Sequence, residues 1–168
     1  EETTTMALIP QVCSAVNIPV IAAGGIGTGR TMLAALALGA DGVQIGSRFV
    51  ATTESSAHEN FKAQVIAAKD DATKLTLKQL IPVRLIWNKF LQEVEEMEKR
   101  GASKEELAEH LGRGRAKLGM FEGDIHEGEM EIGQIAGLIN KIKPAGEIIN
   151  EIVKDFELAR EELSTIQF

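Results

Sequence analysis

Hydrophobic positions in the first 50 residues alternate between helical spacing and continuous apolar runs. Residues 6–16 place apolar side chains at helical spacing, and residues 18–23 form a β-branched run typical of a strand buried on both faces. A second helix is predicted over residues 28–38, which Thr28 can cap, and a second strand with the turn leaving it over residues 41–49. A strand, a helix and a strand in this order predict a βαβ unit with two parallel strands.

The pattern changes after Phe49, because no further strong strand pattern follows. Helical spacing predicts helices over residues 56–68, 81–100, 135–141 and 145–163, with a short helix that begins at Ser103. A glycine-rich segment covers residues 112–133. We therefore expect two regions, strand-bearing residues 1–56 and mainly helical residues 57–168, the latter including the closing helix.

Composition narrows the classes of function. The 168 residues hold 25 acidic and 18 basic side chains, a net charge of −7, without a basic run interleaved with aromatics, so nucleic acid is not an expected partner. No apolar run approaches the roughly 20 residues that span a bilayer, and no signal peptide opens the chain, so we expect a cytoplasmic protein without a membrane partner. No cluster at metal-ligand spacing is visible, and Cys13 is expected to be a small packed side chain on a helix.

Glycines separate the first predicted strand from its helix in the stretch IPVIAAGGIGTGR, residues 18–30. A dinucleotide-binding turn needs G-x-G-x-x-G and an acidic residue at the end of the second strand. Gly25, Gly27 and Gly29 instead have the spacing G-x-G-x-G, and the second strand ends in a glycine turn without a carboxylate. The pattern excludes a dinucleotide fingerprint.

Two neighbouring parallel strands that each end in a glycine turn favour a monophosphate site. Glycine lets backbone amides approach an oxyanion, and a helix N-terminus adds partial positive charge. Paired turns of this kind form the phosphate site after strands 7 and 8 of a (β/α)₈ barrel, and the phosphate of FMN suits them better than a pyrophosphate does. The alternative is that these glycines serve only tight turns between strand and helix.

Residues 18–62, and GQIAGLI at residues 133–139, resemble the nitronate monooxygenase family, formerly 2-nitropropane dioxygenases, and the related flavin-dependent enoyl-acyl carrier protein reductases. The resemblance implies an FMN-binding (β/α)₈ TIM barrel. It assigns the FMN phosphate to backbone amides and a hydroxyl at the following positions: Ala23, Gly24, Gly25, Gly46 and Ser47. Gln134 would line the flavin or substrate pocket by the same analogy, the alternative being a hydrogen bond at a helix start.

The resemblance also implies what lies outside this sequence. The family's catalytic histidine stands in a Gly-His-x-Gly segment just before the part that residues 1–12 match, so we expect it upstream of Glu1 and expect no catalytic residue in this chain. The chain is then an α/β protein, the C-terminal portion of the barrel with an appended helical subdomain. It would need the rest of the barrel and be incomplete and inactive alone, with a homodimer as one option for the enzyme.

The function implied is that of an FMN-dependent oxidoreductase that oxidises small alkyl nitronates with O₂, and GIGTGRTM favours this branch. An alternative is an FMN-dependent NAD(P)H enoyl-acyl carrier protein reductase acting on an enoyl thioester. An alternative of another class is a non-catalytic module that binds a phosphate ligand or a partner.

Three further side chains have specific expectations. Arg48 follows the second turn and would either assist the anion or form an ion pair at the barrel rim. His58 is interpreted as structural at a helix start, and Trp87 as packing in the helical region.

Overall fold

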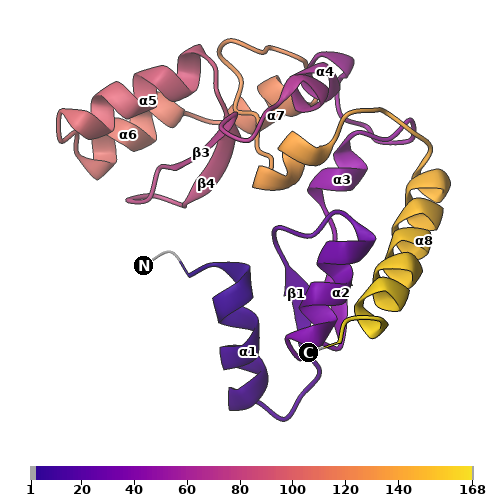
Figure 1. The fold of residues 1–168 in the computed structure, drawn as a ribbon. Helices are drawn as coiled ribbons and strands as arrows, with labels where there is room; N and C mark the ends of the chain where they lie inside the picture. Colours follow the sequence, from indigo (N-terminus) through magenta and orange to yellow (C-terminus); the bar gives the residue numbers. More distant parts are fainter. Residues whose placement is uncertain (1–2, 168) are drawn as a thin grey trace. The chain divides into compact units, whose positions relative to one another are not determined.

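The computed structural model describes residues 3–167 and divides into two compact units (Figure 1). Described residues 3–53 pack with residues 143–167, and Glu54–Ile142 forms the second unit. This division differs from the expected regions 1–56 and 57–168, because the last helix, residues 145–164, packs against the helix of residues 29–37.

The first unit is an α/β arrangement around a two-stranded parallel sheet. Its elements are α1 (Thr5–Ala15), β1 (Ile21–Ala23), α2 (Gly29–Ala37), β2 (Gly42–Gln44), α3 (Ser47–Val50) and α8 (Ala145–Ser164). β1 and β2 are parallel, with Ile21 opposite Gly42, which confirms the predicted βαβ unit. The turn that was expected to leave the second strand includes the single helical turn α3.

Helix α2 begins where the sequence predicted it to. The Thr28 side chain accepts a hydrogen bond from the Thr31 amide, and the Thr31 side chain accepts from the backbone of Thr28, so the two form a reciprocal cap. Gly29 is buried where α2 meets α8, since a Cβ on it would lie 2.0 Å from the Phe156 nitrogen. The two helices therefore touch backbone to backbone at this point.

The core of the first unit is small and lies on one side of the sheet. Ile9, Ala22, Ile26, Ala35 and Ala40 are buried together, with the partly buried side chains Cys13, Met32, Leu38, Val43 and Ile45 packed against them. The expected packed position of Cys13 is confirmed. The expectation of a first strand buried on both faces is wrong within the described residues: Ile21 is 57% exposed, because only the face of Ala22 is covered.

The second unit combines helices with a β-hairpin. It contains α4 (Glu59–Ala67), β3 (Thr73–Thr76), β4 (Val83–Ile86), α5 (Lys89–Lys99), α6 (Lys104–Leu111), α7 (Arg115–Met120) and the 3₁₀ helix η1 (Gln134–Leu138). β3 and β4 are antiparallel, with Thr73 opposite Ile86. Phe90, Leu91 and Val94 of α5 are fully buried against the hairpin and α6.

One helix predicted for this unit is wrong. The helix expected over residues 81–100 is β4 followed by α5, which Asn88 caps by accepting a hydrogen bond from the Leu91 amide at 3.0 Å. This mainly helical region therefore also holds a hairpin, because pairing with β3 decides the conformation of β4. The capping box of Ser103 and Glu106 at the start of α6 is confirmed.

We predict that Gly29→Ala destabilises the protein. An added Cβ would lie 2.0 Å from the Phe156 nitrogen and 2.4 Å from the Ile152 oxygen, so the two helix backbones must move apart. Overpacking of this kind lowers the free energy of unfolding by about 1–3 kcal/mol. Urea denaturation measures the effect.

Gly146→Ala is the matched control on α8, because a Cβ there meets no described atom within 4 Å. The control should keep the wild-type free energy of unfolding or raise it by up to about 1 kcal/mol. Equal stability of the two variants would contradict a close contact at Gly29.

Candidate phosphate-binding site

The two glycine turns leave the sheet at the same edge. Ala23 lies opposite Gln44 in the parallel pair, so the residues that follow each strand emerge side by side at the carboxyl end. Gly24, Gly25 and Gly46 are exposed there, and Ser47 is partly buried. The structure therefore brings together the five residues that the sequence assigned to a phosphate, whose binding role stays a prediction.

The first turn presents two consecutive backbone amides. Gly24 and Gly25 have φ angles of +92° and +74°, the left-handed region that glycine adopts without a steric cost. The Thr5 hydroxyl donates a 3.1 Å hydrogen bond to the Gly24 carbonyl, which holds the turn. Among the hydrogen bonds of residues 3–167 that lie outside helices and strands, none has the Gly24 or Gly25 amide as its donor. These two amides are therefore candidate donors to an acceptor outside the described chain.

The second turn leaves open space beside Gly46. A Cβ on Gly46 would meet no described atom within 4 Å, and its φ of −103° is accessible to other residues. The Gly46 carbonyl accepts a 2.9 Å hydrogen bond from the Phe49 amide, which closes the turn of α3. Ser47 is the first residue of that turn. The chain itself therefore does not require glycine at position 46.

The positive end of α2 is already occupied within the first unit. The amides of Gly27 and Thr28 donate to the Thr31 hydroxyl at 3.1 and 3.0 Å. The Arg30 amide donates to the Asp155 carboxylate of α8 at 3.0 Å. An anion at this edge of the sheet must therefore rely on the turn amides and not on this helix terminus.

Arg48 forms an ion pair with α8. Its side chain is 13% exposed, and its Nη2 lies 3.8 Å from Oε2 of Glu151. Its Nη1 is buried, and no group in residues 3–167 accepts a hydrogen bond from it. Of the two roles expected for Arg48, the ion pair is present, and a buried donor beside Ser47 fits an anionic ligand as well.

The remaining candidates lie in the second unit. Gln134 is the exposed first residue of η1, and its role toward a cofactor stays a prediction. His58 is structural as expected: its Nδ1 accepts a 3.1 Å hydrogen bond from the Asn60 amide at the start of α4. Trp87 is not a packing residue, since it is 42% exposed and has the Lys74 ammonium 5.6 Å from its ring centroid.

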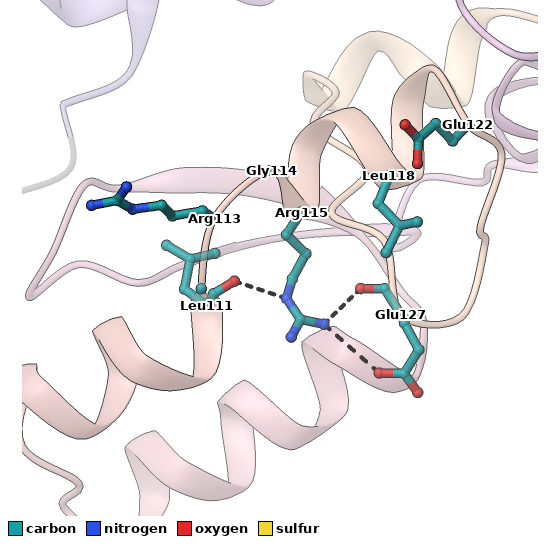
Figure 2. A pocket seen from close by; sticks show the side chains of 8 residues that line it. Leu111, Arg113, Gly114, Arg115, Leu118, Glu122 and Glu127 are labelled. Carbon is teal, nitrogen blue, oxygen red and sulfur yellow. Dashed lines mark hydrogen bonds and ion pairs between the residues drawn. The ribbon is translucent and has the colours of Figure 1, made fainter.

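The second unit also contains a pocket of about 440 Å³ that the sequence analysis did not identify (Figure 2). Its lining residues are Leu111, Gly112, Arg113, Gly114, Arg115, Leu118, Glu122 and Glu127. The Arg115 guanidinium donates to the carbonyls of His110, Leu111 and Glu127 at 2.9, 2.9 and 2.8 Å. It also lies 4.4 Å over the Phe90 ring. Arg115 therefore satisfies the last carbonyls of α6 and serves the fold.

Charged side chains in this pocket pair with other residues of the unit. Lys117 lies 2.8 Å from Glu122, and Glu127 pairs with Lys89 and, at 3.7 Å, with Arg115. The Lys89 hydrogen bond is the main reason why the pKa of Glu127 is lowered. The Gly-Arg-Gly-Arg repeat at residues 112–115 is the sequence feature that could have indicated this pocket. Because most of its charges are paired, the pocket is a weaker candidate than the turns.

The described residues contain neither a cluster of metal-ligating side chains nor a membrane-spanning helix. Between residues 3 and 167, no group of three or more His, Cys, Asp or Glu side chains is arranged to hold a metal ion. No described helix has both the length and the apolar character needed to cross a membrane.

Comparison with known proteins gives consistent matches. The family model described as nitronate monooxygenase matches residues 1–155. A probable nitronate monooxygenase of Bacillus subtilis is 49% identical over 94 residues, which are 55% of this chain and 27% of that protein.

Solved structures match nearly the whole chain. The structure of FabK from Thermotoga maritima has a TM-score of 0.90 and 41% identity over 98% of this chain and 52% of that one. A nitroalkane oxidase from Streptomyces ansochromogenes has a TM-score of 0.78 and 32% identity over 95% of this chain and 45% of that one. The α/β fold is therefore shared, and the chain spans about half the length of these two proteins.

Glu129, beside the Arg115 pocket, makes the stability of the protein depend on pH. Burial and, to a smaller extent, the nearby Glu131 carboxylate raise the pKa of its carboxyl to about 6, and Arg115 opposes both. The folded state therefore binds this proton more tightly than the unfolded state, whose ordinary value is 4.5. The resulting stability is full below pH 4.5 and is lost as the pH rises through about 6.

We predict that Glu129→Gln removes this loss and stabilises the protein above pH 6 by at most about 2 kcal/mol. Urea denaturation from pH 4 to pH 8 measures the profile. Glu131→Gln is the control: it should shift the fall in stability to lower pH without abolishing it. A Glu129→Gln profile that superimposes on the wild type would contradict the argument.

Proposed function

We propose a function from one premise: the chain belongs to the nitronate monooxygenase family. The chain is the C-terminal part of a flavin-dependent oxidoreductase with a (β/α)₈ barrel. Its two glycine turns at the carboxyl edge of β1 and β2 bind the phosphate of FMN. The observation that carries this proposal is the pair of consecutive left-handed glycines, Gly24 and Gly25, beside the open space at Gly46.

Each residue of the site has a defined part in this proposal. The amides of Gly24 and Gly25 donate hydrogen bonds to phosphate oxygens, and Thr5 keeps the Gly24 carbonyl turned away from the anion. Gly46 leaves room for the phosphate, and Ser47 supplies its amide and hydroxyl. When bound, the flavin supplies the two-electron chemistry that oxidation of an alkyl nitronate by O₂ requires. The base that activates the substrate is a histidine outside this chain.

The remaining parts of the proposal concern the whole protein. Residues of the second unit form a subdomain inserted before the closing helix, and Gln134 faces the flavin or its substrate. The enzyme is cytoplasmic and acts on a small molecule as a monomer or homodimer. A chain that bound phosphate ligands without a flavin would instead be the non-catalytic module.

A second candidate is reduction of an enoyl thioester by NAD(P)H, the activity of the other family that the sequence resembles. The likeness to FabK, 41% identical over 98% of this chain, is the observation that favours it. Anaerobic mixing of the full-length flavoprotein with NAD(P)H separates the two candidates. Rapid bleaching of the flavin absorbance supports the reductase, whereas bleaching only by an alkyl nitronate supports the monooxygenase.

We predict that Gly46→Val lowers the affinity for FMN at least about tenfold, and that Gly46→Ala lowers it less. A Cβ at position 46 meets no atom of the described chain within 4 Å, so the substitution should leave the fold intact. The added methyl groups would instead fill the space that the proposal assigns to the phosphate. FMN titration of the flavin-free full-length protein measures the affinity. Gly25→Val is a poorer test, because its φ of +74° adds backbone strain.

Gly146→Ala and Gly146→Val are the matched controls, since position 146 is equally open but lies on α8. Both should keep wild-type affinity for FMN. Wild-type affinity in Gly46→Val would mean that the turn is only structural.

A further inference from the structure

We infer that Arg48 is a positioning residue, which holds the turn of Gly46 and Ser47 against α8 through Glu151 so that the turn can receive a phosphate. This inference rests on the proposed phosphate site. It concerns how that site keeps its shape, which neither the family match nor the glycine spacing explains.

The turn needs an anchor because α3 is only four residues long. One turn of helix fixes several dihedral angles for very few hydrogen bonds, so it does not hold its shape without packing. Arg48 is the second residue of α3, directly after Ser47, and its side chain is 13% exposed. Arg48 is the charged residue of α3, and its position directly after Ser47 places it to fix the start of the turn.

The contacts of Arg48 lead to α8. Its Nη2 lies 3.8 Å from Glu151 Oε2, and Glu151 also pairs with Lys143. Lys143 lies 3.5 Å from Glu147 as well, so four alternating charges run from α3 along the first turns of α8. Such networks hold their geometry better than isolated pairs do.

The other end of α3 is held independently of Arg48. The Thr53 amide donates to the Lys143 carbonyl at 3.2 Å, and the Lys143 amide donates to the Ala51 carbonyl at 3.4 Å. Because these backbone bonds fix the residues after α3, loss of Arg48 should loosen the start of α3. The start is the end that carries Gly46 and Ser47.

Burial gives the Arg48 charge a second effect on the turn. Its Nη1 is buried, with no acceptor in residues 3–167, and little water screens the guanidinium. A buried positive charge directly after Ser47 would stabilise an anion that is bound by the turn. Lysine at this position would keep both the charge and one contact with Glu151, whereas methionine would keep only the packing.

The test compares FMN with riboflavin, which lacks the phosphate. In the flavin-free full-length protein, Arg48→Met should reduce the ratio of FMN to riboflavin affinity about tenfold and leave riboflavin affinity unchanged. Arg48→Lys should restore most of the ratio. Glu151→Gln should lower the ratio, and the double variant Arg48→Met/Glu151→Gln should lower it no further than Arg48→Met alone.

Arg30→Met is the matched control, because Arg30 also pairs with α8, through Glu162, but both side chains are well exposed. It should leave the ratio unchanged. If the wild type prefers FMN and Arg48→Met keeps that preference, or loses both flavins equally, the positioning role is overturned. If the wild type binds both flavins equally, the proposed phosphate site fails, and the inference fails with it. If Arg48→Met does not fold, Glu151→Gln and Arg48→Lys decide in its place.

Discussion

The backbone contact between α2 and α8 at Gly29 is the constraint on which the first unit depends. Because Gly29 has no side chain, the first turn of α2 lies directly on the α8 backbone near Ile152 and Phe156. This contact sets where α8 presents its carboxylates. Asp155 then receives the Arg30 amide, and Glu151 lies within reach of Arg48. A glycine at the start of one helix thus determines which charges surround the candidate site.

Local signals in the sequence were sufficient to predict the βαβ unit. The Thr28 cap and the apolar run before the glycines each act over a few residues, and the structure confirms their consequence. The hairpin of the second unit could not be found in this way. Val83 and Leu85 fit a helix over residues 81–100 as well as they fit a strand, and only pairing with β3 selects the strand.

For the candidate site, too, the sequence predicted the local features but not those that depend on tertiary packing. Glycine spacing located both turns, because parallel strands bring their carboxyl ends to one edge of a sheet. Spacing did not reveal that Asp155 neutralises the start of α2, nor that Arg48 pairs with Glu151. Both facts depend on α8, which is distant in sequence and reaches the site only through tertiary packing.

The charge balance of the edge also bears on the kind of anion that it suits. Peptide amides contribute dipoles without net charge, and a phosphate monoester carries between about −1.5 and −2 at neutral pH. Arg48 adds one buried positive charge, part of which Glu151 already offsets. The edge therefore offers directional donors with limited charge compensation, so it suits a single phosphate held by geometry. A pyrophosphate would need the free helix terminus that Asp155 has already engaged.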